Sequence, residues 1–527
     1  MTRINTNVPS LIAQRVLRQN TGDLNTALER LSTGLRINRG KDDPAGLIAS
    51  QNLRKDIAGT TAAISNAERA DQVVNIAEGG LQEISDLLTE LQSLLTQTAN
   101  EAGLSREEKE ANQLQVDSIL QTIDRLAAST SFQGSKLLNG NFDYNADQIS
   151  GVVSSFQVRG AKLQFNETRD VEILVTASAQ LGGFVLSLGA ASIDLNAADG
   201  SSEQFILEIA GNEGSRQVTF NSGAERDNIV TTINTFTDVT GVRAVASGAS
   251  AVRLVSTEFG TDQFVSVQVV DDGNIQGGAN IGIYSLSNGD TDVVGQAGGA
   301  QTAFSSVPAA NGLIDFGRDV EATINGIRAV SRGTEVSINT DFLDVVVDLN
   351  YDATQPSAAN VGAISAFRIT GGGADFQLDG QVDIAGKVSI GIENVATRNL
   401  GRQLLDTVGG APGSQTFYFL SDLASGKELN IADGDDTKAQ IVLEEAINQV
   451  SALRGRLGAF QQNVIGATIR SLGIALENTS AAESSIRDAD FAAETAELTR
   501  AQILTQSANS TLLQANTAPQ AALQLLG

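Results

Sequence analysis

The sequence predicts a rod-like, mainly α-helical protein whose paired N- and C-terminal arms are long coiled-coil helices, with β-rich or α+β domains inserted between them. Before residue 141 and after residue 440, apolar residues recur with a spacing of three and four, which is the period of a coiled-coil helix. Between residues 141 and 390, short runs of β-branched and aromatic residues alternate with turns. This middle stretch has 30 acidic and 12 basic residues, a net charge of −18 within a total of −27. The ends and the middle are therefore expected to be different kinds of structure.

The first 43 residues predict an amphipathic helix in a basic segment. Seven basic residues stand against four acidic ones between Met1 and Asp43, a net charge of +3. Four leucines follow the three-four spacing of a coiled-coil seam: Leu24, Leu28, Leu31 and Leu35. Because a helix with an apolar stripe has to bury it, we expect residues 1–43 to pair with another segment of this chain or of a second chain.

Residues 44–144 predict an N-terminal helical arm with a short β-hairpin. Asp43 is placed to cap a helix whose first residue is Pro44, where the missing N–H costs nothing. The apolar spacing then predicts one continuous helix about 80 Å long. Ser105 and Glu108 have the spacing of a capping box and begin a second helix that can fold back on the first. The apolar face of this second helix consists of Val116, Ile119, Ile123 and Leu126.

Residues 145–390 predict two small β or α+β domains inserted between the arms. In the first, about residues 203–270, strand-like runs lie on either side of a helix, and Ser222 and Glu225 predict a capping box at its start. The strand-like runs are QFILEIA, RQVTF, VRAVA, AVRLVS and FVSVQVV. This order predicts a strand-strand-helix-strand-strand unit. Weaker strand patterns between Val320 and Thr340 predict a second unit.

The C-terminal part predicts a second helical arm over residues 391–484 and a final helix over residues 485–527. The apolar face of the arm consists of Leu443, Ala446, Val450, Leu453, Leu457, Phe460, Val464, Ala467 and Ile474. In the final helix the same spacing continues through Leu498, Ala501, Leu504, Ala508, Leu512 and Ala515. Residues 501–527 contain no charged residue, but polar residues interrupt them too often for a membrane span, which needs about 20 consecutive apolar residues. We expect the two arms to pair as a rod whose chain goes out and comes back.

The composition excludes several classes of function. Without Cys or His the chain has no disulfide, no thiolate metal site and no imidazole base or ligand, so we predict no catalytic residue, no metal and no cofactor. With 62 acidic and 35 basic residues, it lacks the basic stripe that binds nucleic acid. The acids of residues 433–444 have an EF-hand-like spacing, but Lys438 stands where that loop needs Gly. We interpret this stretch as a capped turn before a helix. The first twenty residues lack the apolar segment of a secretory signal peptide, so we do not expect export by the general secretory pathway.

Two stretches of sequence resemble a known family. LNTALERLSTGLRINRGKDDPAGLIAS, residues 24–50, resembles the N-terminal signature of the bacterial flagellins. SSIRDADFAAETAELTRAQILTQSANSTLLQAN, residues 484–516, resembles their C-terminal signature, and the closing APQAALQLL is similar too. The resemblance covers about residues 1–140 and 395–527, and both ends stand in the right order.

The resemblance implies a structural subunit that polymerises into the extracellular flagellar filament used for swimming. Flagellins are exported unfolded by a dedicated type III apparatus, and their terminal segments, disordered in the monomer, form the inner core of the filament. On this basis residues 1–43 and 485–527 are inner-core helices and residues 145–390 are surface-exposed outer domains. An uncharged tail suits burial among neighbouring subunits, because desolvating an ion costs several kcal/mol. The residues expected in the polymerisation core are Leu24, Leu28, Leu31, Leu35, Leu498, Leu504, Leu512, Leu523, Leu525 and Leu526.

The resemblance also implies the partners. These are other copies of the chain, an export chaperone, and the hook-associated junction and cap proteins, with no nucleic acid and no membrane insertion. In many flagellins a Toll-like receptor contacts the long helix at a motif with Arg where this sequence has Glu90. Leu94 matches that motif, whereas Gln115 replaces an acidic partner. We therefore expect weak recognition by the receptor.

Three alternatives remain open from the sequence. A hook-filament junction protein would share the N-terminal signature, although the tail RAQILTQSANSTLLQAN favours a flagellin. An enzyme in the middle domains cannot be an H-E-x-x-H zinc protease, since there is no His, but a pair of carboxylates could serve a glycosidase. Scattered acids are more often a solvated surface. The middle domains could also bind carbohydrate in addition to a structural role.

Overall fold

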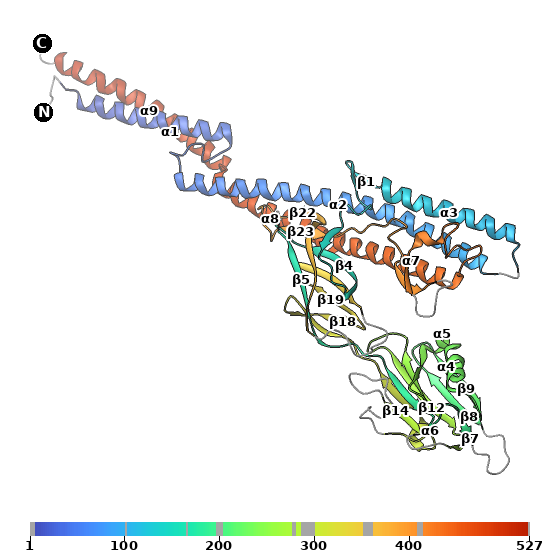
Figure 1. Cartoon of the computed structure of the whole chain (residues 1–527). Helices are drawn as coiled ribbons and strands as arrows, with labels where there is room; N and C mark the ends of the chain where they lie inside the picture. Colours follow the sequence, from blue (N-terminus) through green and yellow to red (C-terminus); the bar gives the residue numbers. More distant parts are fainter. Residues whose placement is uncertain are drawn as a thin grey trace. The chain divides into compact units, whose positions relative to one another are not determined.

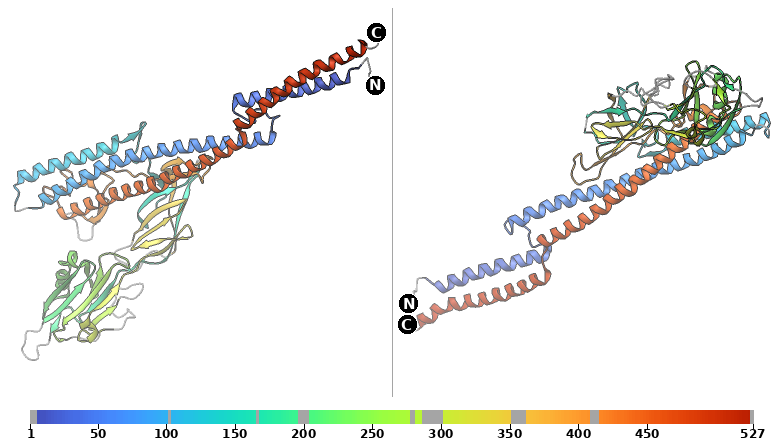
Figure 2. Two further views of the ribbon diagram at one scale, coloured as in Figure 1. Left: turned by 180° about the vertical axis from the view of Figure 1, so that it is seen from behind. Right: turned by 90° about the horizontal axis from the view of Figure 1, so that it is seen from below.

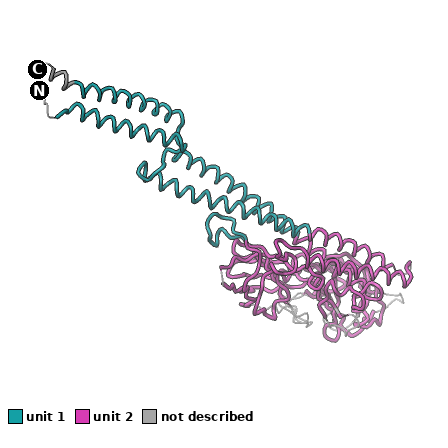
Figure 3. Tube along the Cα trace, turned by 90° about the horizontal axis from the view of Figure 1, so that it is seen from above, with its two compact units in different colours: residues 1–79, 376–388, 454–527 teal, residues 80–375, 389–453 magenta. Residues whose placement is uncertain are grey.

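Helices form both ends of the chain and antiparallel strands form the middle, as the sequence predicts (Figure 1). The structure is a computed structural model of the 527-residue chain. It describes residues 6–100, 103–164, 167–195, 204–276, 281–285, 301–350, 362–407 and 415–524. These residues fall into two compact units (Figure 3): residues 1–79, 376–388 and 454–527 belong to the first, and residues 80–375 and 389–453 to the second. No helix in the described ranges is both long and apolar enough to cross a membrane.

The first unit contains a pair of terminal helices. Helix α1 (Val8–Thr33) begins where the Asn7 side chain accepts a hydrogen bond from the backbone N–H of Ser10, and it ends at Gly34, whose φ of 71° suits a residue without a Cβ. Helix α9 (Phe491–Gln524) lies beside α1 and antiparallel to it (Figure 2). Helix α8 (Gly466–Arg487) precedes α9.

The long helix α2 (Pro44–Thr98) confirms the predicted N-terminal arm. The carboxylate of Asp43 accepts a hydrogen bond of 2.9 Å from the backbone N–H of Gly46, so the predicted cap is present. The three-four spacing also predicts the buried face. Its fully buried members include Ala67, Val74, Ala77, Leu81, Ile84, Leu88 and Leu91.

Helix α3 (Arg106–Ser129) has the predicted capping box. The Ser105 hydroxyl accepts from the backbone N–H of Glu108 at 3.3 Å, and the Glu108 carboxylate accepts from the backbone N–H of Ser105 at 2.8 Å. Three of the four predicted apolar residues, Val116, Ile119 and Ile123, are buried, and Leu126 is half-buried. The short hairpin β1 (Ser131–Phe132) and β2 (Ser135–Lys136) follows.

The C-terminal arm departs from the predicted single helix. It consists of α7 (Asp436–Ala459), a π-helical segment η2 (Phe460–Ile465) and α8. A π segment adds one residue per turn and so rotates everything after it. As a result Ile465 is buried in place of the predicted Val464, and Ile474 is 62% exposed, which makes those two assignments wrong.

The predicted capped turn lies just before helix α7 of this arm. The Asp435 carboxylate accepts from the backbone N–H of Lys438 at 3.1 Å, so the acidic stretch is a capped turn, as interpreted. Before it lie the hairpin β24 (Gln403–Asp406) and β25 (Gln415–Tyr418) and the short helix η1 (Leu420–Leu423).

In the second unit, a flanking β core is built from residues on either side of an inserted segment. Its buried residues lie between Tyr144 and Ala179 and between Val320 and Ile369. One sheet has the order β17-β16-β5-β21-β3 and the other β18-β19-β20-β4. The strands are β3 (Tyr144–Asp147), β4 (Val153–Ala161), β5 (Arg169–Ala177), β16 (Glu321–Ile324), β17 (Ile327–Arg328), β18 (Val330–Arg332), β19 (Glu335–Asn339), β20 (Leu343–Leu349) and β21 (Gly362–Gly372). The hairpin β22 (Ala374–Gln377) and β23 (Lys387–Ile390) follows, and its residues 376–388 belong to the first unit.

The inserted segment forms a central β core, whose buried residues lie between Phe184 and Ala309. One sheet has the order β10-β11-β6-β14 and the other β15-β12-β8-β9. The elements are β6 (Gly183–Ser187), β7 (Asp194–Leu195), β8 (Gln204–Ala210), β9 (Ser215–Asn221), α4 (Arg226–Asn234), α5 (Thr237–Thr240), β10 (Val242–Ser247), β11 (Ala251–Ser256), β12 (Phe264–Asp271), β13 (Ile275–Gln276), β14 (Gly282–Ser285), α6 (Val307–Asn311) and β15 (Leu313–Phe316).

The central core contains every predicted strand of residues 203–270, but it arranges them differently. The strands β8, β9 and β12 share one sheet, whereas β10 and β11 belong to the other, so the predicted strand-strand-helix-strand-strand unit is split. The predicted capping box is also wrong. Glu225 is the N-cap of α4 without a side-chain hydrogen bond, and the Ser222 hydroxyl accepts from the backbone N–H of Leu195 at 3.2 Å.

Candidate assembly interface

The buried positions in the seam between α1 and α9 have small side chains. These positions are Ser10, Ala13 and Ala27 on α1 and Ala501, Ala508 and Ala515 on α9. The three alanines of α9 are seven residues apart, which places them on one stripe of the helix. Small side chains allow two helix backbones to approach closely. The buried positions of this seam therefore have small side chains, and partly buried leucines such as Leu24 and Leu512 lie between them in the three-four spacing.

Polar contacts fix the register of this antiparallel pair. The Asn7 amide donates to the carbonyl of Ala515 at 2.8 Å, and the Asn20 amide donates to the carbonyl of Leu504 at 3.1 Å. Near the other end, Arg30 forms an ion pair of 3.0 Å with Glu494. Contacts at both ends and in the middle hold a single alignment of the two helices.

Large apolar side chains on both helices remain exposed to solvent. On α1 they are Val8, Leu11, Ile12, Val16 and Leu28, and on α9 they are Phe491, Ile503, Leu504 and Leu513. Leu513 and Phe491 are each 69% exposed. Exposed apolar residues gathered on a helix pair are typical of a site of protein association, because burying each such side chain contributes about 1.5–3 kcal/mol.

The leucines predicted for the polymerisation core differ in their exposure within the single chain. Leu28 and Leu504 are exposed, and the partly buried ones are Leu24, Leu31, Leu35, Leu498 and Leu512. Leu523 lies in the last turn of α9. Leu525 and Leu526 lie outside the described residues. Ala501, Ala508 and Ala515, which belong to the predicted apolar spacing of the final helix, are buried.

The break after α1 lies beside the break between α8 and α9. Leu35, just after α1, forms an isolated β-bridge with Asp488, just after α8. The backbone N–H of Arg36 donates to the carbonyl of Arg487 at 2.7 Å, and the backbone N–H of Ala489 donates to the carbonyl of Gly34 at 2.9 Å. The loop after α1 is itself braced by Asp42. Hydrogen bonds from the backbone of residues 38 and 39 hold the pKa of its carboxyl below the usual value, although desolvation opposes them.

The middle of α2, residues 71–78, is joined to the C-terminal arm by polar contacts. Arg454 donates to the Glu78 carboxylate from two of its nitrogens, at 3.1 and 2.9 Å. Gln461, in the π segment, donates to Asp71 at 2.8 Å and to Asn75 at 3.0 Å. Helix α8 itself has no buried residue among those that the structure describes. Like α1 and α9, it leaves most of its surface uncovered.

The three residues predicted to meet an immune receptor all lie in the second unit. Glu90 is exposed on α2 and Gln115 is exposed on α3. Leu94 is buried, with 7% of its surface accessible, so it packs inward. Of these three residues, only Glu90 and Gln115 are therefore accessible to a binding partner when the chain is a monomer.

Asp117 of α3 connects that helix to the segment after η1. The Ser425 backbone N–H and hydroxyl donate to its carboxylate at 2.9 and 2.5 Å. Burial tends to raise the pKa of Asp117, but these hydrogen bonds and one from Gln113 outweigh it and hold the pKa below the usual value. Across the described residues, no cluster of three or more acidic side chains is arranged to hold a metal ion.

Comparison with known proteins identifies the family. Residues 4–143 match the family model of the bacterial flagellin N-terminal helical region, and residues 441–526 match that of the C-terminal helical region. A flagellin of Aquifex aeolicus is 29% identical over 567 residues, covering 100% of this chain and 99% of that protein. A flagellin of Salmonella muenchen is 28% identical over 549 residues, covering 99% of each.

Solved structures of flagellar proteins are also similar to the chain. FliC from Burkholderia pseudomallei is 15% identical with a TM-score of 0.23, covering 75% of this chain and 99% of that one. The flagellar junction protein FlgL from Legionella pneumophila is 11% identical with a TM-score of 0.26, covering 83% and 99%.

The chain therefore belongs to the bacterial flagellins. It is a structural subunit of the flagellar filament, and its place is outside the cell. Family membership points to a structural protein.

Proposed function

We propose that copies of this chain polymerise through the large apolar side chains that α1 and α9 leave exposed. The observation that carries the proposal is that the buried positions of the α1–α9 seam are mainly alanines, whereas large apolar residues such as Leu11, Ile503 and Leu513 are exposed on the same helices. Three of the four exposed apolar residues of α9, namely Ile503, Leu504 and Leu513, lie in residues 501–527, which have no charged side chain. A neighbour can therefore cover them without desolvating an ion.

The charge-substituted variant Leu513→Asp tests this proposal. A charge at a position that becomes buried on assembly forfeits about 1.5–3 kcal/mol of burial, which raises the critical concentration for seeded growth about tenfold or more. The monomer keeps its circular dichroism and melting temperature, because Leu513 is 69% exposed there. Gln514→Asp is the matched control, since it adds the same charge at the adjacent exposed position. Equal filament yields from the two variants would contradict the proposal.

We also propose the division of the chain that the sequence suggested: residues 1–43 and 485–527 act as inner-core helices, 44–144 and 391–484 as helical arms, and 145–390 as outer domains. Strand β3 pairs with the end of β21, which brings Asn145 opposite Gly371. A short Gly-Ser turn can therefore replace residues 146–370, because the two strands of this chain already lie side by side there. The shortened chain is expected to form filaments on parent seeds. A folded shortened chain that never elongates such seeds would show that the outer domains are needed for assembly.

Further partners follow from family membership. We propose an export chaperone and the hook-associated junction and cap proteins, and we propose that the chain acts without catalysis, metal or cofactor. For the Toll-like receptor we propose weak recognition, because Glu90 places a negative charge on the exposed face of α2. Glu90→Arg is expected to raise receptor activation in a reporter assay, with Gln115→Arg as a control that adds a positive charge on α3. Strong activation by the parent chain would contradict this.

A further inference from the structure

The two β cores are connected by the chain passing twice between them. The polypeptide leaves the flanking core after Ala179 and returns to it before Val320. At this crossing the backbones of Gln180 and Arg318 exchange two hydrogen bonds, of 2.9 and 2.8 Å. Two passing strands of this kind form a narrow ribbon, and a ribbon alone permits bending between the bodies that it joins.

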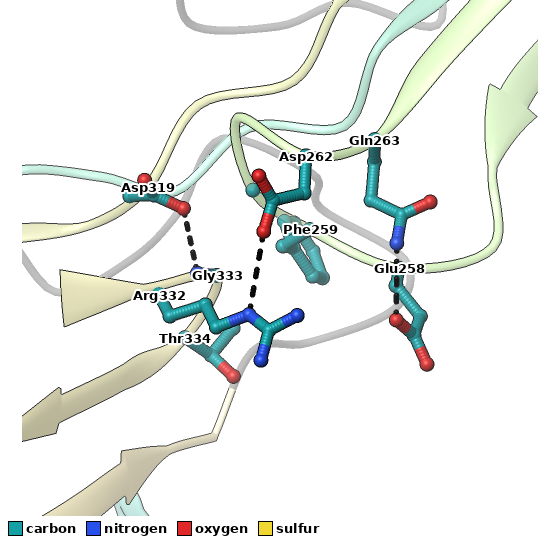
Figure 4. Close-up of a pocket in the computed structure, with 9 residues that line it drawn as sticks. Glu258, Phe259, Asp262, Gln263, Asp319, Arg332, Gly333 and Thr334 are labelled. Carbon is teal, nitrogen blue, oxygen red and sulfur yellow. Dashed lines mark hydrogen bonds and ion pairs between the residues drawn. The ribbon is translucent and has the colours of Figure 1, made fainter. Parts of the chain in front are cut away.

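A loop of the central core provides a third connection. This loop, residues 257–263, lies between β11 and β12 and reaches the turn between β18 and β19 in the flanking core. Its Thr261 donates to the Asp319 carboxylate from the backbone N–H at 3.1 Å and from the hydroxyl at 2.7 Å. The same carboxylate accepts from the backbone N–H of Gly333 at 2.7 Å (Figure 4). Asp319 therefore joins the crossing chain, the loop and the flanking turn in one place.

Further contacts surround this carboxylate. Asp262 of the loop forms an ion pair of 3.4 Å with Arg332 (Figure 4). Phe259 is partly buried and packs against the flanking core. Hydrogen bonds from Thr261 and Gly333 hold the pKa of Asp319 below its usual value against the opposing effect of burial, so the carboxylate is ionised at neutral pH.

The backbones meet too closely for side chains. A Cβ at Gly260 would lie 2.8 Å from the Asp319 carboxylate and 3.0 Å from the backbone nitrogen of Gly333. A Cβ at Gly333 would lie 2.8 Å from the carbonyl oxygen of Phe259, and the φ of Gly333 is +58°. These two glycines allow an approach that another residue would prevent.

A polar cavity of about 200 Å³ lies at this meeting point. Its polar groups bond to one another or to their neighbours: Gln263 donates to Glu258 at 3.2 Å, and Thr334 donates to Asp348 at 2.6 Å. This arrangement suits a joint between two bodies better than a ligand site, because the hydrogen-bonding groups are already engaged.

We propose that the loop of residues 257–263 is a brace that fixes the angle between the flanking and central β cores, with Asp319 as its positioning residue. Without the brace, the ribbon at Gln180 and Arg318 acts as a hinge. With it, the central core is presented in one orientation. This inference does not depend on how the terminal helices assemble.

Distance measurements between spin labels test the brace. The chain has no Cys, so Leu174→Cys on the flanking core and Thr219→Cys on the central core, both at exposed positions, label the full-length protein at two sites only. The parent is expected to give one narrow distance distribution. Asp319→Ala removes all three hydrogen bonds and is expected to widen that distribution at least about twofold. Asp238→Ala, an exposed Asp on α5 of the central core, is the matched control and is expected to leave it unchanged.

A milder variant keeps the test decisive if Asp319→Ala fails to fold. Thr261→Val removes only the hydroxyl donor and is expected to widen the distribution by a smaller amount. Circular dichroism verifies that each variant is folded. A broad distribution in the parent, or an unchanged distribution in a folded Asp319→Ala or Thr261→Val variant, would overturn the proposal.

Discussion

The terminal pair α1–α9 and the C-terminal half of α2 are both helical, and both follow a three-four spacing. They nevertheless bury different residues. In α2, Leu81, Leu88 and Leu91 are completely buried within the single chain. In the terminal pair the buried positions are mainly alanines, and Leu11 and Leu513 are exposed. The same periodicity thus corresponds to a completed core in α2, where the chain itself covers the large side chains, and to an incomplete core in the terminal pair, where large side chains stay exposed. What differs is whether the chain itself supplies enough surface to cover the large side chains.

The largest expected effect is on the completed core. Leu88→Ala is expected to lower the free energy of unfolding by about 2–5 kcal/mol, because it removes a buried side chain and leaves a cavity. Thr89→Ala, at the adjacent exposed position, is expected to change it by about 0.5 kcal/mol or less. Urea unfolding measures both. A similar small loss in the two variants would show that this half of α2 is not a packed core.

A smaller effect is expected in the terminal pair. Ala508→Leu puts a large side chain into the seam and is expected to cost about 1–3 kcal/mol through overpacking, with loss of helical circular dichroism at a lower temperature. Ser507→Leu adds the same side chain on the exposed face and serves as the control. If both variants melt like the parent, α1 and α9 do not pair in the monomer as the structure has them.

The smallest effect concerns pH and the attachment of α3. The folded pKa of Asp117 lies below 3.8, so this carboxylate stabilises the fold at higher pH, and the stabilisation is lost as pH falls below 3.8 through the folded pKa. Asp117→Asn is therefore expected to be less stable than the parent at neutral pH, by about 1 kcal/mol after allowance for solvent screening. The difference should shrink as the pH falls.

Unfolding midpoints of the parent and of Asp117→Asn across a pH series provide the measurement. Ser425→Ala removes the hydroxyl partner, and in the Asp117→Asn background it is expected to have a reduced effect. A difference that is independent of pH would mean that the charge of Asp117 does not hold α3 to the segment after η1.

The sequence by itself determined the features that depend on neighbours along the chain. Asp43 and Pro44 set the start of α2, and Ser105 and Glu108 set the start of α3, because capping involves residues within one turn. The buried face of α2 followed from periodicity for the same reason. The strands of the central core were also predictable, since alternation along a strand is a local pattern.

Only the tertiary structure decided which faces and strands meet. The π segment at Phe460 rotates the helix so that Ile465 is buried and Val464 is not. The apparent capping residue Ser222 instead accepts from Leu195, 27 positions away. In the terminal pair, the close approach of two helices buries Ala501, Ala508 and Ala515 and leaves Leu504 and Leu513 exposed. The pairing partner in each case is distant in sequence, and a spacing pattern carries no information about the distance between two backbones.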